Sequence, residues 1–413
     1  MPARTSILIL SALALLVSLR ARADDEARPC ATGVDVKTPE WLAGCEAAIA
    51  GEADAKRRAP LLFGRAFGAV ERFRYDDAIA DLNAALAADP ENPDYLRERA
   101  FVHGELSNYS EAIDDLSHFI KQYPDDPSGY RERAYARHFS ADLKGAYEDY
   151  ARVLELTPDS LQSLLARAEA ALWLGRFDEA NVDAGSAQSR AQAFHEVEAL
   201  GAATELLSRI QRWRDAVKGG DAAKRCKQAR AIHKGGASKL VGDCSRAFLE
   251  ASTGGAKADA LTNRSVAWLA VANSPKSTTE DMRMALAFDP GNSERRVNLG
   301  YSYLASSESA AAMREFNSVL AGEKQWLALA GRAVARANLG DTEGATADAL
   351  ESQKINPNEV ATTVLADIAY EKGDRDRARG LYLDLYRLGT RNDRLFERLS
   401  ELGVADPARA AGK

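Results

Sequence analysis

Few side chains in this protein are placed to do redox, metal or acid–base chemistry. Among 413 residues there are four cysteines, in two local pairs, and five scattered histidines without the His-Glu-x-x-His spacing of a metal site. The chain also lacks the Gly-x-x-x-x-Gly-Lys-Ser/Thr loop that cradles phosphates and the Gly-x-Ser-x-Gly turn of a nucleophilic serine. We therefore expect no enzyme activity, no bound metal and no cofactor.

The cysteines are better suited to covalent cross-links. The second cysteine of each pair opens a similar phrase, Cys-Glu-Ala-Ala-Ile at position 45 and Cys-Ser-Arg-Ala-Phe at position 244. We predict two disulfides, Cys30–Cys45 and Cys226–Cys244, each joining a short helical segment to its neighbour. A closed loop of about 15 residues contributes up to ~3 kcal/mol. A four-thiolate zinc site is the alternative, but it usually needs a close Cys-x-x-Cys spacing that is absent here.

The N-terminus has the features of a secretory signal peptide. Arg4 precedes an apolar run from Ser6 to Leu19, and the small residues Ala21 and Ala23 precede an acidic stretch. We expect cleavage after Ala23 and a periplasmic or secreted protein, in an oxidising compartment that suits disulfides. The alternative is an uncleaved membrane anchor, although the apolar run is shorter than the ~20 residues that a spanning helix needs. We expect no membrane span in the mature chain.

Composition narrows the class of protein further. The net charge is −7, which argues against nucleic-acid binding because that needs a basic face. Hydrophobic residues make up 46% of the chain and β-branched runs are rare, as in all-helical proteins.

Small residues and prolines recur at an interval of 34 residues. The recurring residues are Ala66, Ala100, Ala134 and Ala168; Ala78, Ala112, Ala146 and Ala180; and Pro90, Pro124 and Pro158. Such a period means that one supersecondary unit is copied along the chain. Apolar residues within each copy have helical spacing, and the prolines end the second helix. Small side chains let two antiparallel helices approach closely, and a bulky residue there would cost about 1–3 kcal/mol.

This pattern resembles the tetratricopeptide repeat family, which has small residues at positions 8 and 20 of a 34-residue unit and proline at position 32. Leu82, Leu116 and Tyr150 occupy the large apolar position 24, whereas the usual tryptophan at position 4 is replaced. The resemblance implies an all-α tetratricopeptide α-solenoid of stacked helix-turn-helix hairpins, in two arrays joined by an irregular helical segment.

The repeat pattern and the glycine pairs that interrupt it predict the domain organisation. We expect a signal peptide at residues 1–23, a cysteine-clamped helical cap at 24–58, a first array of about four repeats at 59–194, an irregular helical linker with the second cysteine pair at 195–256, a second array of about four divergent repeats at 257–390, and a capping helix and tail at 391–413.

The resemblance also implies a site. In tetratricopeptide proteins the first helices line a concave groove that contacts a bound peptide. The corresponding residues are Arg97, Phe101, Arg131, Tyr135, His138 and Trp173. Arginine and aromatic side chains carry much of the binding energy in interfaces. The alternative is that the arginines pair with Glu98 and Glu132 while the aromatic rings pack between repeats.

A second arginine series recurs at position 7 of all four repeats of the first array. Its members are Arg65, Arg99, Arg133 and Arg167. Because the series recurs while its neighbours differ, we expect it to be structural and to bridge adjacent hairpins.

Together these observations favour a non-catalytic protein–protein interaction scaffold of the bacterial cell envelope, which binds a protein or peptide segment in its concave groove. One alternative is a structural, self-assembling envelope component, since self-association is possible for stacked repeats. Another is a glycan-contacting accessory subunit of an export machine, suggested by the aromatic residues of the groove.

Overall fold

The structure, a computed structural model, describes residues 30, 36, 38–216, 222–227, 237–272 and 275–411. The predicted signal peptide lies outside these residues. Helices connected by short turns make up the described chain, and no strand occurs in it. The chain divides into two compact units, residues 1–219 (unit 1) and residues 220–413 (unit 2).

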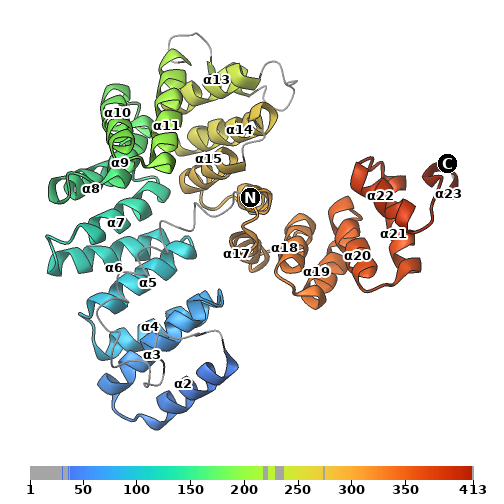
Figure 1. Ribbon diagram of the computed structural model, residues 1–413, viewed down its shortest axis with the longest axis horizontal. Helices are drawn as coiled ribbons and strands as arrows, with labels where there is room; N and C mark the ends of the chain where they lie inside the picture. The colour runs from blue at the N-terminus through green and yellow to red at the C-terminus, as the bar shows by residue number, and fades with distance from the viewer. Residues whose placement is uncertain are drawn as a thin grey trace. The chain divides into compact units, whose positions relative to one another are not determined.

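The helices of unit 1 alternate along the chain with short turns (Figure 1). Their bounds are α2 Pro39–Gly51, α3 Ala55–Val70, α4 Tyr75–Ala88, α5 Pro93–Glu105, α6 Tyr109–Gln122, α7 Pro127–Phe139, α8 Leu143–Leu156, α9 Leu161–Trp173, α10 Phe177–Ala193 and α11 Val197–Ala216.

Unit 2 is built in the same manner. Its helices are α12 Ala222–Cys226, α13 Ala237–Glu250, α14 Gly254–Ala272, α15 Pro275–Phe288, α16 Ser293–Ala305, α17 Ser309–Leu320, α18 Trp326–Asn338, α19 Thr342–Ile355, α20 Glu359–Glu371, α21 Arg375–Leu388, α22 Asp393–Glu401 and α23 Pro407–Ala410.

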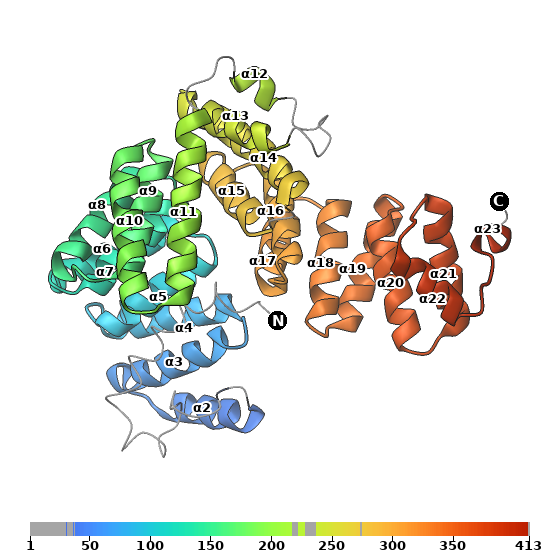
Figure 2. The same ribbon diagram turned by 45° about the horizontal axis from the view of Figure 1, so that its top comes forward.

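Consecutive helices pack as antiparallel hairpins. In unit 1 the hairpins are α3/α4, α5/α6, α7/α8 and α9/α10, and each second helix also packs on the first helix of the next hairpin. First helices of successive hairpins touch as well, as α9 touches α11, α16 touches α18 and α18 touches α20. Figure 2 shows this stacking within each unit. The predicted all-α solenoid of stacked hairpins is confirmed.

The repeated alanines lie where the two helices of each hairpin meet. Ala66 and Ala78 are fully buried, as are Ala134 and Ala146 two repeats later. A larger side chain at these positions would have to push the helices apart, which explains the recurrence of small residues.

Local signals begin the helices of each repeat. Pro93 and Pro127 stand in the first turn of α5 and α7, where the missing N–H is harmless. The side chains of Asn92 and Asp126 accept hydrogen bonds from the first backbone N–H groups of the same helices. Helix starts are thus encoded within the sequence of each repeat.

The turn inside each hairpin uses a left-handed residue. Phe73, Ser107, Ala141 and Gly175 lie 34 residues apart and have φ values of 58°, 60°, 67° and 73°. The residue that follows closes the first helix, as when the Arg176 N–H donates to the Ala171 carbonyl oxygen. Glycine adopts this conformation without strain, whereas other residues pay about 1–2 kcal/mol. Three of these four hairpin turns, those at Phe73, Ser107 and Ala141, are therefore strained.

A bidentate arginine–aspartate pair joins the two helices of most hairpins. The arginine on the first helix donates two N–H groups to the carboxylate of an aspartate on the second, with donor–acceptor distances of 2.5 to 2.9 Å. The pairs are Arg65–Asp81, Arg99–Asp115, Arg133–Asp149, Arg167–Asp183, Arg225–Asp243, Arg264–Asp281 and Arg332–Asp348.

Two members of the second arginine series also donate hydrogen bonds to the preceding hairpin, which is the bridging role expected for the series. A further N–H of Arg99 donates to Asn83 at 2.8 Å, and one of Arg133 donates to Ser117 at 3.0 Å. Arg332 repeats the arrangement in unit 2 with Asn317 at 2.8 Å. The strongest bonds nevertheless lie within one hairpin, because the carboxylate accepts two of them.

Both predicted disulfides are present. Cys30 is joined to Cys45 and Cys226 to Cys244, with Cα atoms 4.7 and 4.8 Å apart, and this pairing excludes the zinc alternative. The first disulfide lies against α3, where a Cβ atom on Gly64 would come within 2.2 Å of the Cys30 carbonyl oxygen. Close approach explains glycine at that position.

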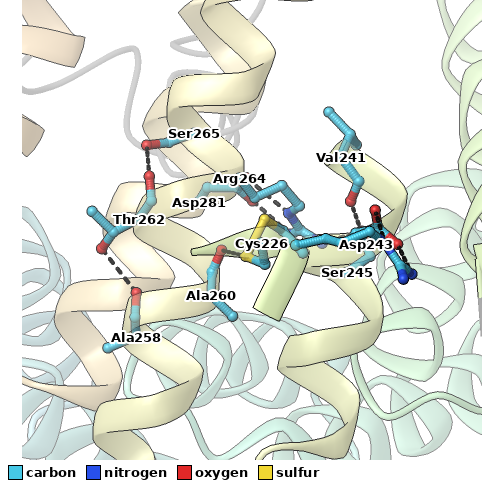
Figure 3. The surroundings of a disulfide bond; sticks show 12 residues. Cys226, Val241, Asp243, Ser245, Ala258, Ala260, Thr262, Arg264, Ser265 and Asp281 are labelled. Atoms are coloured by element: carbon cyan, nitrogen blue, oxygen red, sulfur yellow. Dashed lines mark hydrogen bonds and ion pairs between the residues drawn. A yellow bond between two sulfur atoms is a disulfide. The ribbon is translucent and has the colours of Figure 1, made fainter. Parts of the chain in front are cut away.

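The second disulfide connects the helices with which unit 2 begins. It joins α12 to α13, and the Cys226 sulfur lies 3.8 Å from the Ala260 carbonyl oxygen of α14. Figure 3 shows it beside the buried pair of Arg264 and Asp281.

Candidate partner-binding face

The predicted site residues lie on the first helices of unit 1. We call the surface formed by α3, α5, α7, α9 and α11 the first-helix face. Side chains on neighbouring first helices meet across it: Arg97 of α5 bonds to Glu132 of α7, and Trp173 of α9 packs on Trp213 of α11. The successive helices therefore form one continuous surface.

Arg97 is already paired on this face. Its Nε and Nη2 atoms donate to Glu132 at 3.3 and 2.6 Å, and its guanidinium lies 5.4 Å from the centre of the Phe119 ring. Both charged side chains are only about one-fifth exposed, at 21% and 19%. The charge of Arg97 is thus satisfied within the protein, by one of the two glutamates that the alternative interpretation named.

Arg131 stands at the equivalent position one repeat later but has no such partner. Its half-buried side chain makes no hydrogen bond or ion pair with any of the described residues. One turn further along α7 lies Tyr135, also half-buried, whose ring contacts Phe139 edge to face at 4.8 Å. Phe101 of α5 is half-buried against a core cluster that includes Ala66 and Val102. Arg131 and the partly exposed rings of Phe101 and Tyr135 therefore lie on one surface.

His138 and Trp173 lie in the interior. They are 7% and 2% exposed, and their rings pack edge to face with centroids 6.2 Å apart. Trp173 also packs on Trp213 of α11 at 5.4 Å. Both side chains are buried, so the partly exposed members of the predicted set are Arg97, Phe101, Arg131 and Tyr135.

Glu98 is a charged residue of this face whose environment sequence reasoning did not foresee. It is half-buried and forms no hydrogen bond with the described residues. Burial raises the pKa of its carboxyl to about 7, and the negative charge of Glu132 acts in the same direction. The nearby charge of Arg97 offsets only part of the effect because that guanidinium is bonded to Glu132.

At the α9 and α11 end of the face, charged side chains pair with each other. Glu169 of α9 accepts a hydrogen bond from Arg209 of α11 at 2.7 Å, and both side chains are largely buried. Glu98 on α5 and Arg131 on α7, in contrast, have no such partner among the described residues.

On α20 of unit 2, the polar side chains at comparable positions are paired. Asp367 of α20 accepts hydrogen bonds from Tyr382 at 2.6 Å and from Arg394 at 2.8 Å. Tyr370 donates to Glu401 at 2.7 Å, and Arg398 covers its ring at 4.2 Å. The polar groups of this surface pair with one another, which makes unit 1 the stronger candidate for binding.

None of the helices in the described part of the chain is both long enough and apolar enough to cross a bilayer. The two disulfides point to an oxidising, extracytoplasmic environment.

Comparison with known proteins agrees with the hairpin architecture. Residues 67–128 match the family model of the tetratricopeptide repeat. No curated protein sequence matches the chain. Similar solved structures include a tetratricopeptide repeat protein from Parabacteroides merdae ATCC 43184, 13% identical, which covers 74% of this chain and 97% of its own with a TM-score of 0.31.

Two further solved structures are similar. MamA is 14% identical and covers 38% of this chain and 90% of its own, with a TM-score of 0.36. The tetratricopeptide domain of P58(IPK) is 16% identical and covers 86% of this chain and 99% of its own, with a TM-score of 0.26.

The fold and the face define a helical-hairpin repeat protein. Residues 67–128 match the tetratricopeptide repeat, as the sequence pattern predicted, and the hairpins beyond them pack in the same way. Proteins of this family are generally non-catalytic scaffolds for protein–protein interaction.

Proposed function

We propose that this protein is an exported interaction scaffold of the cell envelope, which binds a segment of a protein partner on the first-helix face of unit 1. The observation that carries the proposal is the unpaired Arg131 on the same face as the partly exposed rings of Phe101 and Tyr135. Arginine and aromatic residues supply most of the energy in protein interfaces. Stacked hairpins hold these side chains on a rigid surface, which limits the ordering cost of binding.

Export is part of the same proposal. Support comes from the signal-peptide features of residues 1–23 and from two disulfides in a chain with four cysteines. Cell fractionation followed by mass spectrometry without reductant tests it. We expect a periplasmic or secreted chain that begins at Asp24 and contains no free thiol, whereas a cytoplasmic chain with four thiols would contradict it.

The glycan alternative rested on an open aromatic groove that included Trp173. Because Trp173 is 2% exposed and packs between His138 and Trp213, this observation no longer favours it.

Partner capture tests the proposed face. The tagged full-length protein is cross-linked in its native host, purified and analysed by mass spectrometry, in parallel with a variant that combines Phe101→Ala and Arg131→Ala. Arg152→Ala is the matched control, because it removes a partly exposed arginine from α8, a second helix of the same unit. We expect the double variant to lose the partner and Arg152→Ala to retain it, with unchanged helical dichroism in both. Equal capture by all three proteins would remove the site.

A further inference from the structure

Two side chains of opposite charge are left without a partner on adjacent first helices. Glu98 of α5 and Arg131 of α7 are both half-buried, and neither makes a hydrogen bond or ion pair with the described residues. An ionised group that is partly removed from water and unpaired is costly. A bound group of opposite charge would recover that cost, so each side chain specifies the charge of what covers it.

Each of these charges stands one turn before an aromatic ring on its own helix. Phe101 follows Glu98 by three residues and Tyr135 follows Arg131 by four, so each ring shares a helix face with its charge. The ion pair of Arg97 and Glu132 links the same two helices. Because Arg97 and Glu132 neutralise each other, neither needs a charged group of a ligand as its partner.

We propose that the face of α5 and α7 binds a partner segment that carries one basic and one acidic side chain, with the basic group against Glu98 and the acidic group against Arg131. The inference rests on the proposed function and adds the chemistry of the bound segment. It differs from recognition of an acidic segment alone, because the unpaired Glu98 disfavours a second anion at its end of the face.

The helix geometry limits the spacing of the two charges in the partner. The ion pair of Arg97 and Glu132 bridges α5 and α7, whose axes lie at least about 8–10 Å apart, the distance between directly packed helices. An extended chain advances about 3.3–3.6 Å per residue. A basic and an acidic residue two to four positions apart would therefore reach both groups. The basic group would also favour the ionised form of Glu98, whose pKa in the unbound protein is raised to about 7 by burial.

A peptide selection tests the proposal. Random 12-residue peptides displayed on phage are selected on the immobilised, disulfide-intact full-length protein, and synthetic copies are measured by fluorescence polarisation. We expect enrichment of sequences with a basic and an acidic residue two to four positions apart.

Charge-neutral variants then assign each contact. For a selected peptide that contains lysine and glutamate, we expect Glu98→Gln and Arg131→Gln each to weaken binding about tenfold. In a double-mutant cycle, Glu98→Gln should have no effect on the peptide whose lysine is replaced by norleucine, and Arg131→Gln none on the peptide whose glutamate is replaced by glutamine. Glu111→Gln on α6 and Arg152→Gln on α8 are the matched controls and should change nothing.

The outcomes separate this inference from the function on which it rests. Peptides that bind the first-helix face without a charge pair, or purely acidic peptides that bind equally well, would overturn the inference and leave the scaffold function standing. A selection that yields no peptide sensitive to Phe101→Ala or Arg131→Ala would contradict both.

Discussion

Removal of one buried aspartate should test how the hairpins are held together. Asp149 accepts hydrogen bonds from Arg133 at 2.9 and 2.7 Å and from Arg137 at 2.9 Å, and its side chain is 5% exposed. The equivalent Asp183 in the next hairpin accepts hydrogen bonds from Arg167 alone among the residues that the structure describes. Loss of one partner of a buried ion pair costs about 3–5 kcal/mol because the other charge stays buried and unpaired. The arginines here are partly exposed, so we expect about 3 kcal/mol for Asp149→Ala and about 2 kcal/mol for Asp183→Ala.

Hydrogen exchange measures the loss of stability in the hairpin that contains the substitution. Unfolding of a long repeat protein is not two-state, whereas exchange reports the local opening of each helix. A cost of 3 kcal/mol corresponds to about hundredfold faster exchange, which we expect for the amides of α7 and α8 in Asp149→Ala. In Asp183→Ala, the amides of α9 and α10 should exchange about thirtyfold faster. Changes below threefold in both variants would refute the idea that these carboxylates hold the hairpins together, and equal effects would refute the additional contribution of Arg137.

Three other predictions follow from the turn geometry, the buried acid and the second disulfide. Ala141→Gly should stabilise unit 1 by about 0.5–1 kcal/mol by relieving a left-handed turn, and Gly175→Ala should destabilise it by a similar amount, measured as shifts of the urea midpoint. The raised pKa of Glu98 means that the native state holds its proton more strongly than the unfolded chain does, so stability should fall as pH rises from about 4.5 to about 7. Because the side chain is only half-buried, Glu98→Gln should then stabilise the protein by about 1–2 kcal/mol at pH 8 and by little at pH 4; an unchanged pH profile would contradict this. Replacement of Cys226 and Cys244 by serine should cost unit 2 about 3 kcal/mol, seen as faster proteolysis of unit 2 at unchanged proteolysis of unit 1.

The fold could be predicted because each repeat carries its own signals. Buried small residues such as Ala66 and Ala78, and capped starts such as that of Asn92, act within or between neighbouring helices and so leave a fixed period in the sequence. The aspartates that pair with the second arginine series were missed, although they recur at the same interval. Asp81 and Asp115 are 34 residues apart like the arginines, so a search for periodic charges would have found them.

The candidate site was less predictable because it depends on contacts beyond one repeat. Trp173 is buried by Trp213, which belongs to α11 and lies outside the 34-residue pattern. The sequence left Glu98 and Glu132 as equal partners for the arginines. Helix geometry separates them, because adjacent residues such as Arg97 and Glu98 point in different directions, whereas Glu132 on the next first helix faces Arg97.

Site-specific photo-cross-linking tests the central claim, that a partner binds the first helices of unit 1. A photoreactive amino acid replaces Phe101 of α5 in one strain, and in another it replaces Val182, which is 65% exposed on the second helix α10. We predict a discrete cross-linked partner in living cells from position 101 and none from position 182. Cross-links from position 182 together with none from position 101 would contradict the account.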